Sequence, residues 1–424
     1  MKIKFLAIIA LASCCFMSCS DDDKSDNHST EQTDITKPDD PGKTDEPGKT
    51  DDPGKTDDPG KPDDLSPKPE ERWSDINNTY LFGSLSDDVK AVLPVVPGTS
   101  IDNIGMLYAN DIVMNSTHAF IVDSGNNTIH RVSLDSLEVE KNYIDLGQDI
   151  GPYTAYVDDK ELYIVCNLTS QVVKVDLSTK QQTVVLNADH LVSGTAVTKV
   201  GNTVIVADSE YNFEDSAKTE GKLVVIKEDG SIIEHKTATP NPTFIQSVKL
   251  DGKDFIVSSN SGVIQYDENW QPKAPEQSCV QLWALDDLVK NEDPAVKTHC
   301  EQNSSVGRLF VSDSHLYVGD GVTPKVYMTG ITQLADFDTW TNMTFGDAGS
   351  LGMTIPVTVE DDLAVFNFNQ DSMTWVRGEH RLTLKLSPSE ASKKGPISVV
   401  YDASHRRIYV LNSSSGSLDL LNVK

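Results

Sequence analysis

The run Phe120-Ile121-Val122-Asp123 decides the fold, because similar runs return six more times along the chain. Each copy is a short apolar run, typical of a strand, and each closes on Asp, Asn or Ser. The copies recur every 41 to 61 residues. The other six are Ile164-Val165-Cys166-Asn167, Ile205-Val206-Ala207-Asp208, Ile256-Val257-Ser258-Ser259, Tyr317-Val318-Gly319-Asp320, Ala364-Val365-Phe366-Asn367 and Tyr409-Val410-Leu411-Asn412.

Further β-rich runs surround each copy. In the second copy one run precedes it at 153–157, another follows a tight turn at 172–176, and a fourth follows at 183–186. Four antiparallel strands repeated at this spacing are typical of one blade of a β-propeller. The sequence therefore predicts an all-β protein whose residues 73–424 form a seven-bladed β-propeller.

The last copy ends at Lys424 after only three strands, which would leave a row of unpaired backbone groups. The segment Thr79 to Val96 has the composition to supply the missing strand. We therefore expect an N-terminal strand to close the final blade. A separate N-terminal hairpin is the alternative.

The first 18 residues have the pattern of an export signal. Lys2 and Lys4 precede a short apolar stretch, and Phe16-Met17-Ser18-Cys19 leads directly into an acidic run. We expect lipid attachment at Cys19, although Leu11-Ala12-Ser13-Cys14 is a tidier match to a lipoprotein signal. An ordinary secreted protein with an acidic mature end is the other interpretation.

Residues 19–72 have the composition of a disordered acidic linker. A hexapeptide containing Asp, Pro, Gly, Lys and Thr recurs there, and proline and glycine in every period prevent a continuous helix or strand. The Gly-Lys-Thr pieces lack the strand and helix that a phosphate-binding loop needs. The linker is thus predicted to be a passive, extended spacer.

Charge and cysteine content narrow the class of partners. The formal net charge is -29, of which -21 falls on residues 73–424, and this disfavours nucleic acid and direct binding to anionic lipid. The membrane would then be reached only through the lipid anchor. Cys279 and Cys300 lie within an inserted stretch from Trp270 to Glu301, predicted to enlarge the outer part of the fourth blade, and are candidates for a disulfide. That insertion fits local stabilisation or a partner contact.

The closing residues of the seven copies are expected to meet at the mouth of the central channel: Asp123, Asn167, Asp208, Ser259, Asp320, Asn367 and Asn412. One interpretation is a polar ring that binds a solute or a cation. The other is that these side chains only bond nearby turn backbone.

Aromatic residues extend the candidate ligand-binding set. The turn after Asp208 is long and carries Tyr211 and Phe213, while Tyr153 and Phe244 fall on the same predicted side. Exposed aromatics among carboxylates suit contact with a ring-shaped ligand.

The segments Asp123-Ser124-Gly125-Asn126-Asn127-Thr128-Ile129 and Asn167-Leu168-Thr169-Ser170-Gln171-Val172-Val173 resemble the YVTN-type propeller repeat. The Cys-Ser-Asp-Asp-Asp opening is similar to the surface-export signal of Bacteroidota lipoproteins. Together they resemble surface propeller lipoproteins that capture cobalamin or ferric siderophores. This resemblance implies an outer-membrane, cell-surface protein that passes a small ligand to a TonB-dependent transporter. A periplasmic orientation is the alternative.

Signatures of catalysis are missing, which favours a non-enzymatic binding protein. Propeller lactonases nevertheless assemble a metal site from distant carboxylates and amides. A similar hydrolase, with Ca²⁺ held by Asp123, Asn167, Asp208 and Asp320, is therefore the second hypothesis. A protein-interaction or adhesion module is the third.

Overall fold

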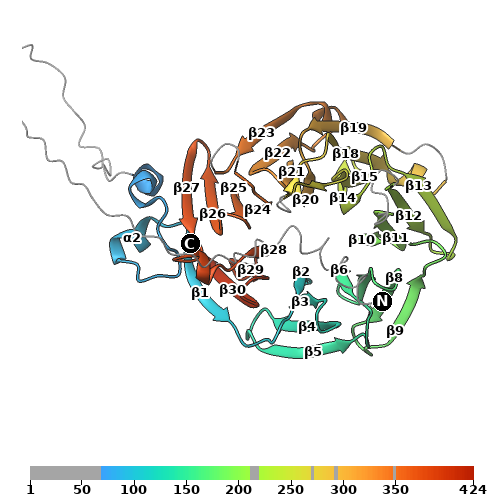
Figure 1. Ribbon diagram of the computed structural model, residues 1–424, viewed down its shortest axis with the longest axis horizontal. Coiled ribbons are helices and arrows are strands. Elements are labelled where there is room, and N and C mark those ends of the chain that lie inside the picture. Colours follow the sequence, from blue (N-terminus) through green and yellow to red (C-terminus); the bar gives the residue numbers. More distant parts are fainter. Residues whose placement is uncertain (1–67, 211–218, 269–271, 291–294, 347–349) are drawn as a thin grey trace, which may run out of the picture. The chain divides into compact units, whose positions relative to one another are not determined.

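Seven four-stranded antiparallel sheets stand side by side in a ring around a common centre (Figure 1). The computed structural model describes residues 68–210, 219–268, 272–290, 295–346 and 350–424. The first strands of neighbouring sheets contact one another all the way round, and β2 of the first sheet contacts β28 of the last. The seven-bladed β-propeller predicted from the repeat is confirmed.

Each blade runs outward from its first strand in chain order. Blade 1 holds β2 (Ala109–Met114), β3 (His118–Asp123), β4 (Thr128–Ser133) and β5 (Val139–Asp145). Blade 2 holds β6 (Pro152–Val157), β7 (Glu161–Cys166), β8 (Gln171–Asp176) and β9 (Gln182–Leu186). Blade 3 holds β10 (Gly194–Val200), β11 (Thr203–Asp208), β12 (Lys222–Ile226) and β13 (Ile232–Lys236). Blade 4 holds β14 (Pro242–Leu250), β15 (Lys253–Asn260), β18 (Gln277–Ala284) and β19 (Ala295–Gln302).

The remaining blades follow the same plan. Blade 5 holds β20 (Val306–Val311), β21 (His315–Asp320), β22 (Lys325–Gly330) and β23 (Trp340–Thr344). Blade 6 holds β24 (Thr354–Val359), β25 (Asp362–Asn367), β26 (Ser372–Arg377) and β27 (His380–Lys385). Blade 7 holds β28 (Pro396–Asp402), β29 (Arg407–Asn412) and β30 (Ser417–Val423), and β1 (Val95–Ile101) completes it.

The second strand of each blade is the apolar run that repeats in the sequence. Strands β3, β7, β11 and β29 are buried along almost their whole length, whereas β5 and β9 on the outside expose most of theirs. A second strand has a neighbouring blade on each face, so both of its faces lose contact with water. This explains why the copies read as continuous apolar runs rather than as an alternation.

Closure by an N-terminal strand is confirmed, but the strand lies later than expected. β1 pairs with β30 from Val95 opposite Val423 to Ile101 opposite Leu418. Only the last two residues of the predicted segment belong to it. Pro97 and Gly98 sit at an irregularity in the pairing on the blade's outer edge, where proline is tolerated.

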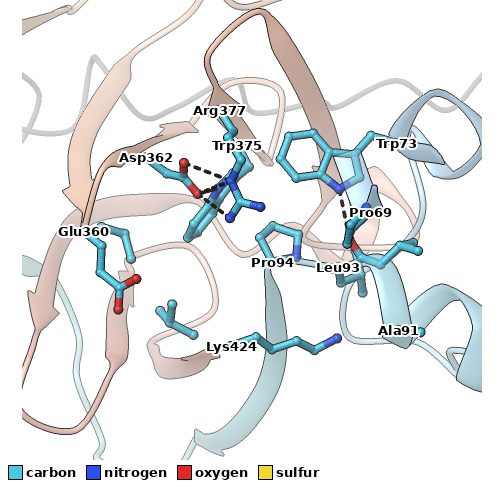
Figure 2. Close-up of a pocket in the computed structure, with 13 residues that line it drawn as sticks. Pro69, Trp73, Ala91, Leu93, Pro94, Glu360, Asp362, Trp375, Arg377 and Lys424 are labelled. Carbon is cyan, nitrogen blue, oxygen red and sulfur yellow. Dashed lines mark hydrogen bonds and ion pairs between the residues drawn. The ribbon is translucent and has the colours of Figure 1, made fainter. Parts of the chain in front are cut away.

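The rest of the predicted closing segment covers the edge of blade 6. The N–H of Leu81 donates to the C=O of Lys385 at 2.9 Å, and Tyr80 forms a parallel bridge with Lys385. Ahead of this bridge the 3-10 helix η1 (Pro69–Ile76) spans the predicted start of the propeller at Trp73. Trp73 is buried, and its indole N–H donates to the C=O of Val92 at 2.9 Å (Figure 2).

Helices are few and short among the described residues. Besides η1 they are α2 (Asp87–Val92), α3 (Leu285–Leu288), η3 (Leu334–Asp338) and η4 (Glu390–Ser392). No helix in the described part of the chain combines the length and apolar character that a membrane crossing requires.

Blade 4 carries a large insertion, part of which precedes its two outer strands. Extra residues lie in the turn before β18, where β16 (Gln265–Tyr266) pairs with β17 (Pro272–Lys273), and α3 follows β18. Cys279 and Cys300 face each other on β18 and β19 and form a disulfide. The cysteines therefore join the third and the outermost strand of blade 4, in the outer part of the blade where the sequence placed the insertion. Trp270 lies outside the described residues.

Truncation tests the closure. Removing residues 1–101 should lower the free energy of unfolding by about 5 kcal/mol or more, because it strips β1 from β30 and removes the buried Trp73. Removing residues 1–67 should leave the urea midpoint within error of the full chain. Equal midpoints for the two truncations would contradict this role of β1 and η1.

Candidate ligand-binding face

One face of the ring is fastened by seven equivalent backbone hydrogen bonds. In every blade the N–H of the residue after the second strand donates to the C=O of the residue before the first strand, at 2.7 to 3.0 Å. The turns between second and third strands therefore lie beside the segments that enter the first strands. We call this the mouth face. The donor and acceptor pairs are Ser124–Tyr108, Asn167–Gly151, Ser209–Ser193, Ser261–Asn241, Gly321–Ser305, Phe368–Met353 and Ser413–Gly395.

These bonds correct the alignment of the repeat in two blades. The residue that closes the second strand is Cys166 in blade 2 and Asn260 in blade 4, one position away from the predicted Asn167 and Ser259. Cys166 occupies the position that Asp123 and Asp208 hold in blades 1 and 3. A search for a polar closing residue therefore shifts the alignment of blade 2 by one residue, to Asn167. Burial raises the pKa of Cys166 to about 12. Asn167 is instead a half-buried turn residue.

Asp123 is fully buried and holds the backbone of its own blade. Its carboxylate accepts from the N–H groups of Leu107 and Tyr108 at 3.1 to 3.3 Å, and from Asn126 Nδ2 at 2.6 Å. His130 Nδ1 accepts from a backbone N–H, so its Nε2 carries the proton and donates to Asp123 at 3.2 Å. Burial raises the pKa of Asp123, but the bonds from His130, Tyr108 and Asn126 outweigh it, and the pKa lies below its ordinary value.

Asp208 plays the same part in blade 3. It is fully buried and accepts from the N–H groups of Val192 at 2.9 Å and Ser193 at 2.7 Å. Here burial is the larger influence, and the pKa of Asp208 is raised despite these donors. Lys222 Nζ lies 3.8 Å from the carboxylate.

Asp320, Asn367 and Asn412 are also buried and bonded within their own blades. Asp320 accepts from Ser304 Oγ at 2.7 Å and from the N–H groups of Val322 and Thr323 at 2.8 Å. Asn367 Oδ1 accepts from the N–H of Gln370, and Asn412 Nδ2 donates to Asp419. The structure therefore does not place these predicted ligand-binding side chains on the surface; they hold turns.

Of the four aromatic residues predicted to bind a ligand, two lie within the described residues. Tyr153 on β6 and Phe244 on β14 are half-buried on first strands. Phe244 lies under the guanidinium of Arg308, 4.6 Å from its ring centroid. Tyr211 and Phe213 lie outside the described residues.

The buried aspartates place exposed apolar residues on the mouth face. Leu107 and Tyr108, whose N–H groups Asp123 binds, are 60% and 43% exposed, and Val192, bound by Asp208, is 52% exposed. Half-buried Leu168 lies between them in chain order, in the turn of blade 2. Leu107, Tyr108, Leu168 and Val192 form what we call the apolar arc. A Cβ at Gly125 would lie 2.5 Å from Leu107 Cβ, so only glycine fits beneath the arc.

An ion pair joins the first strands of blades 1 and 5, which are not neighbours in the ring. Arg308 Nη1 on β20 donates to Asp111 Oδ1 on β2 at 2.9 Å, and Nη2 donates to the C=O of Asn110 at 3.3 Å. Asp111 also accepts from Ser398 Oγ of blade 7 at 2.8 Å and from the N–H of Ala155 of blade 2 at 3.3 Å. Four blades thus converge on Asp111. Sequence reasoning missed this pair; its only signal is a charge inside an otherwise apolar first strand.

Two cavities lie away from the mouth face. One of about 510 Å³ is lined by Lys199, Lys249 and Asp254, at the ends of β10 and β14 that are farthest from the mouth face. The other, of about 250 Å³, lies between Trp73, Arg377 and Lys424 (Figure 2). Two of the charged side chains that line them form ion pairs: Lys199 with Glu161 at 2.6 Å, and Arg377 with Asp362 at 2.7 Å.

The residues proposed for a Ca²⁺ site do not converge. Asp123, Asp208 and Asp320 are each occupied by donors of their own blade, and Asn167 donates its N–H to Gly151. Within the described ranges no group of three or more His, Cys, Asp or Glu side chains could hold a metal ion.

Comparison with known proteins identifies the fold class. No protein-family model matches the chain, and no curated protein matches it in sequence. Among solved structures, hydrazine synthase of Kuenenia stuttgartiensis aligns with TM-score 0.57 and 13% identity, over 75% of this chain and 96% of that chain.

Two further solved structures give the same result. An inactive virginiamycin B lyase of Staphylococcus aureus with quinupristin aligns with TM-score 0.54 and 11% identity, over 77% of this chain and 99% of that chain. The WD40 propeller domain of Doa1 aligns with TM-score 0.54 and 14% identity, over 78% and 97%. At these identities the likeness is one of fold alone. The protein is a seven-bladed β-propeller.

Asp123 and Asp208 should respond oppositely to acid. Asp123→Asn should cost about 2 kcal/mol at pH 7 because its Nδ2 opposes the backbone donors. The depressed pKa of Asp123 means that its stabilisation is present above its unfolded pKa, near 4, and is lost as pH falls below it. The gap between wild type and Asp123→Asn should therefore shrink on acidification.

The raised pKa of Asp208 gives its contribution to stability the opposite dependence on pH. Its stabilising contribution is full below the unfolded pKa and is lost as pH rises through the folded pKa. The gap between wild type and Asp208→Asn should therefore grow as pH falls from about 7 to about 3. Urea titrations across this range measure both gaps, and a common direction would refute the assignment.

Proposed function

We propose that this chain is a non-enzymatic binding propeller of the cell envelope that holds a small organic ligand on its mouth face. The observation that carries the proposal is the apolar arc, in which Leu107, Tyr108 and Val192 are exposed while their backbone N–H groups are bound by buried aspartates. Exposed apolar side chains with polar groups beside them are the usual composition of a ligand site. A pre-positioned site also loses little entropy on binding.

The ligand class is a corrinoid or a ferric siderophore, and the role is capture for TonB-dependent uptake. Both classes present broad apolar or ring surfaces that suit the apolar arc, with polar groups that suit Asn110 and Arg308. The export signal, Cys19 and the acidic linker support a lipid-anchored position on the outer face of the outer membrane. The linker would carry the propeller away from the lipid.

A metal-dependent hydrolase has less support. Its proposed ligands are saturated within separate blades, as the bonds of Asp123 and Asp320 illustrate. The carboxylate of Asp111 likewise already accepts hydrogen bonds from Arg308 Nη1, from Ser398 Oγ and from the N–H of Ala155. An interaction module remains the competing function, and ligand binding separates the two.

The full-length chain should show a thermal shift with cyanocobalamin or with a ferric siderophore, because a ligand that binds only the folded state raises its melting temperature. Leu107→Ser combined with Val192→Ser should weaken that binding roughly tenfold or more, since two apolar contacts are lost. Titration calorimetry gives the affinities.

The control is Val184→Ser combined with Val296→Ser. These valines are 51% and 39% exposed on the outer strands β9 and β19, away from the mouth face. This variant should bind as the wild type does. Equal losses in both double variants, or no binding of any compound by the wild type, would argue against the proposal.

A further inference from the structure

The guanidinium of Arg308 is hydrogen-bonded to β2, the strand that follows Leu107 and Tyr108 of the apolar arc. Its Nη2 donates to the C=O of Asn110, which is two residues beyond Tyr108 on the same strand entry. The side chain is 17% exposed, and Phe244 supports one face of the guanidinium. A planar cation is therefore bonded to the chain two residues from the part of the arc that blade 1 supplies.

Arg308 has hydrogen-bonding capacity that the protein does not use. A guanidinium has five N–H groups in a fixed plane. Nη1 and Nη2 have acceptors, but Nε is buried and has no hydrogen-bond partner among the described residues. Nη1 and Nη2 each carry two N–H groups and have one acceptor each among the described residues, and the side chain is 17% exposed, so a ligand oxygen at the exposed part of the guanidinium would use this remaining capacity.

The partner carboxylate does not depend on Arg308 alone. Asp111 accepts from Ser398 Oγ and from the N–H of Ala155 as well. If Arg308 shares its charge with a second anion, Asp111 keeps two donors from blades 7 and 2. The pair is thus built to admit an additional oxyanion at the guanidinium.

We propose that Arg308 recognises an oxyanion of the bound ligand, a carboxylate or a phosphate, while the ligand's apolar part rests on the apolar arc. This deepens the proposed function by requiring an anionic group in the ligand. Guanidinium is suited to this task because its planar N–H edge matches the oxygens of carboxylate and phosphate. Asp111 competes for the same cation and limits the affinity for anions.

The test uses the full-length chain with inorganic phosphate and with succinate, each against chloride at equal ionic strength, and reads the melting temperature. Both anions should raise it in the wild type, and the larger response identifies phosphate or carboxylate as the preferred group. Arg308→Gln should reduce the affinity roughly tenfold or abolish the shift. Arg131→Gln removes a guanidinium from the partly exposed pair with Glu140 and should keep the wild-type dose response.

Asp111→Asn supplies the decisive second variant, since it does not depend on how Arg308→Gln folds. Removing the competing carboxylate should lower the half-saturating anion concentration several-fold. An unchanged or weaker response in Asp111→Asn, an unchanged response in Arg308→Gln, or no anion response in the wild type would each overturn the inference.

The same variants separate this inference from the proposed function. Cyanocobalamin or siderophore binding that is equal in wild type and Arg308→Gln would overturn the role of Arg308 and leave ligand capture intact. An Arg308-dependent phosphate response without binding of any organic compound would support the anion site and remove the proposed capture function.

Discussion

The buried carboxylate at the end of a second strand is the interaction on which the mouth face depends. Asp123 and Asp208 are fully buried, and each takes two backbone N–H groups from the segment that enters its blade. Because those N–H groups belong to Leu107, Tyr108 and Val192, the same bonds decide where the exposed apolar side chains stand. A carboxylate that no ligand reaches thereby shapes the surface that a ligand would meet.

This arrangement requires a closed ring. Second strands are buried only because each blade has a neighbour on both sides, and β1 supplies the outer strand of blade 7 beside blade 1. The Arg308–Asp111 pair depends on closure in the same way, since it joins first strands whose residues are far apart in the chain. Local turn geometry and global topology therefore fix the mouth face together.

The fold was predictable because the repeat is written in strand-length apolar runs, of which Phe120-Ile121-Val122-Asp123 is the clearest. The sequence also indicated that Asp123, Asp208 and Asp320 matter, but it could not say whether their carboxylates face a ligand or a turn. That choice depends on which N–H groups the preceding loop presents. The pairing of Arg308 with Asp111 was equally unpredictable. It depends on irregularities in the first strands and on which blades the closed ring places opposite one another. Blade 2 was misaligned by one residue because Cys166 stands where Asp123 stands in blade 1, and a thiol does not match a pattern of polar closing residues.

Hydrogen exchange measured by mass spectrometry tests the central claim without any ligand. The claim is that buried aspartates hold Leu107, Tyr108 and Val192 of the apolar arc. The account predicts that Asp123→Asn accelerates exchange in peptides containing the N–H groups of Leu107 and Tyr108, while the segment around Val192 keeps its protection. Asp208→Asn should produce the reverse pattern. Unchanged exchange at both segments, or equal acceleration across all blades, would contradict it.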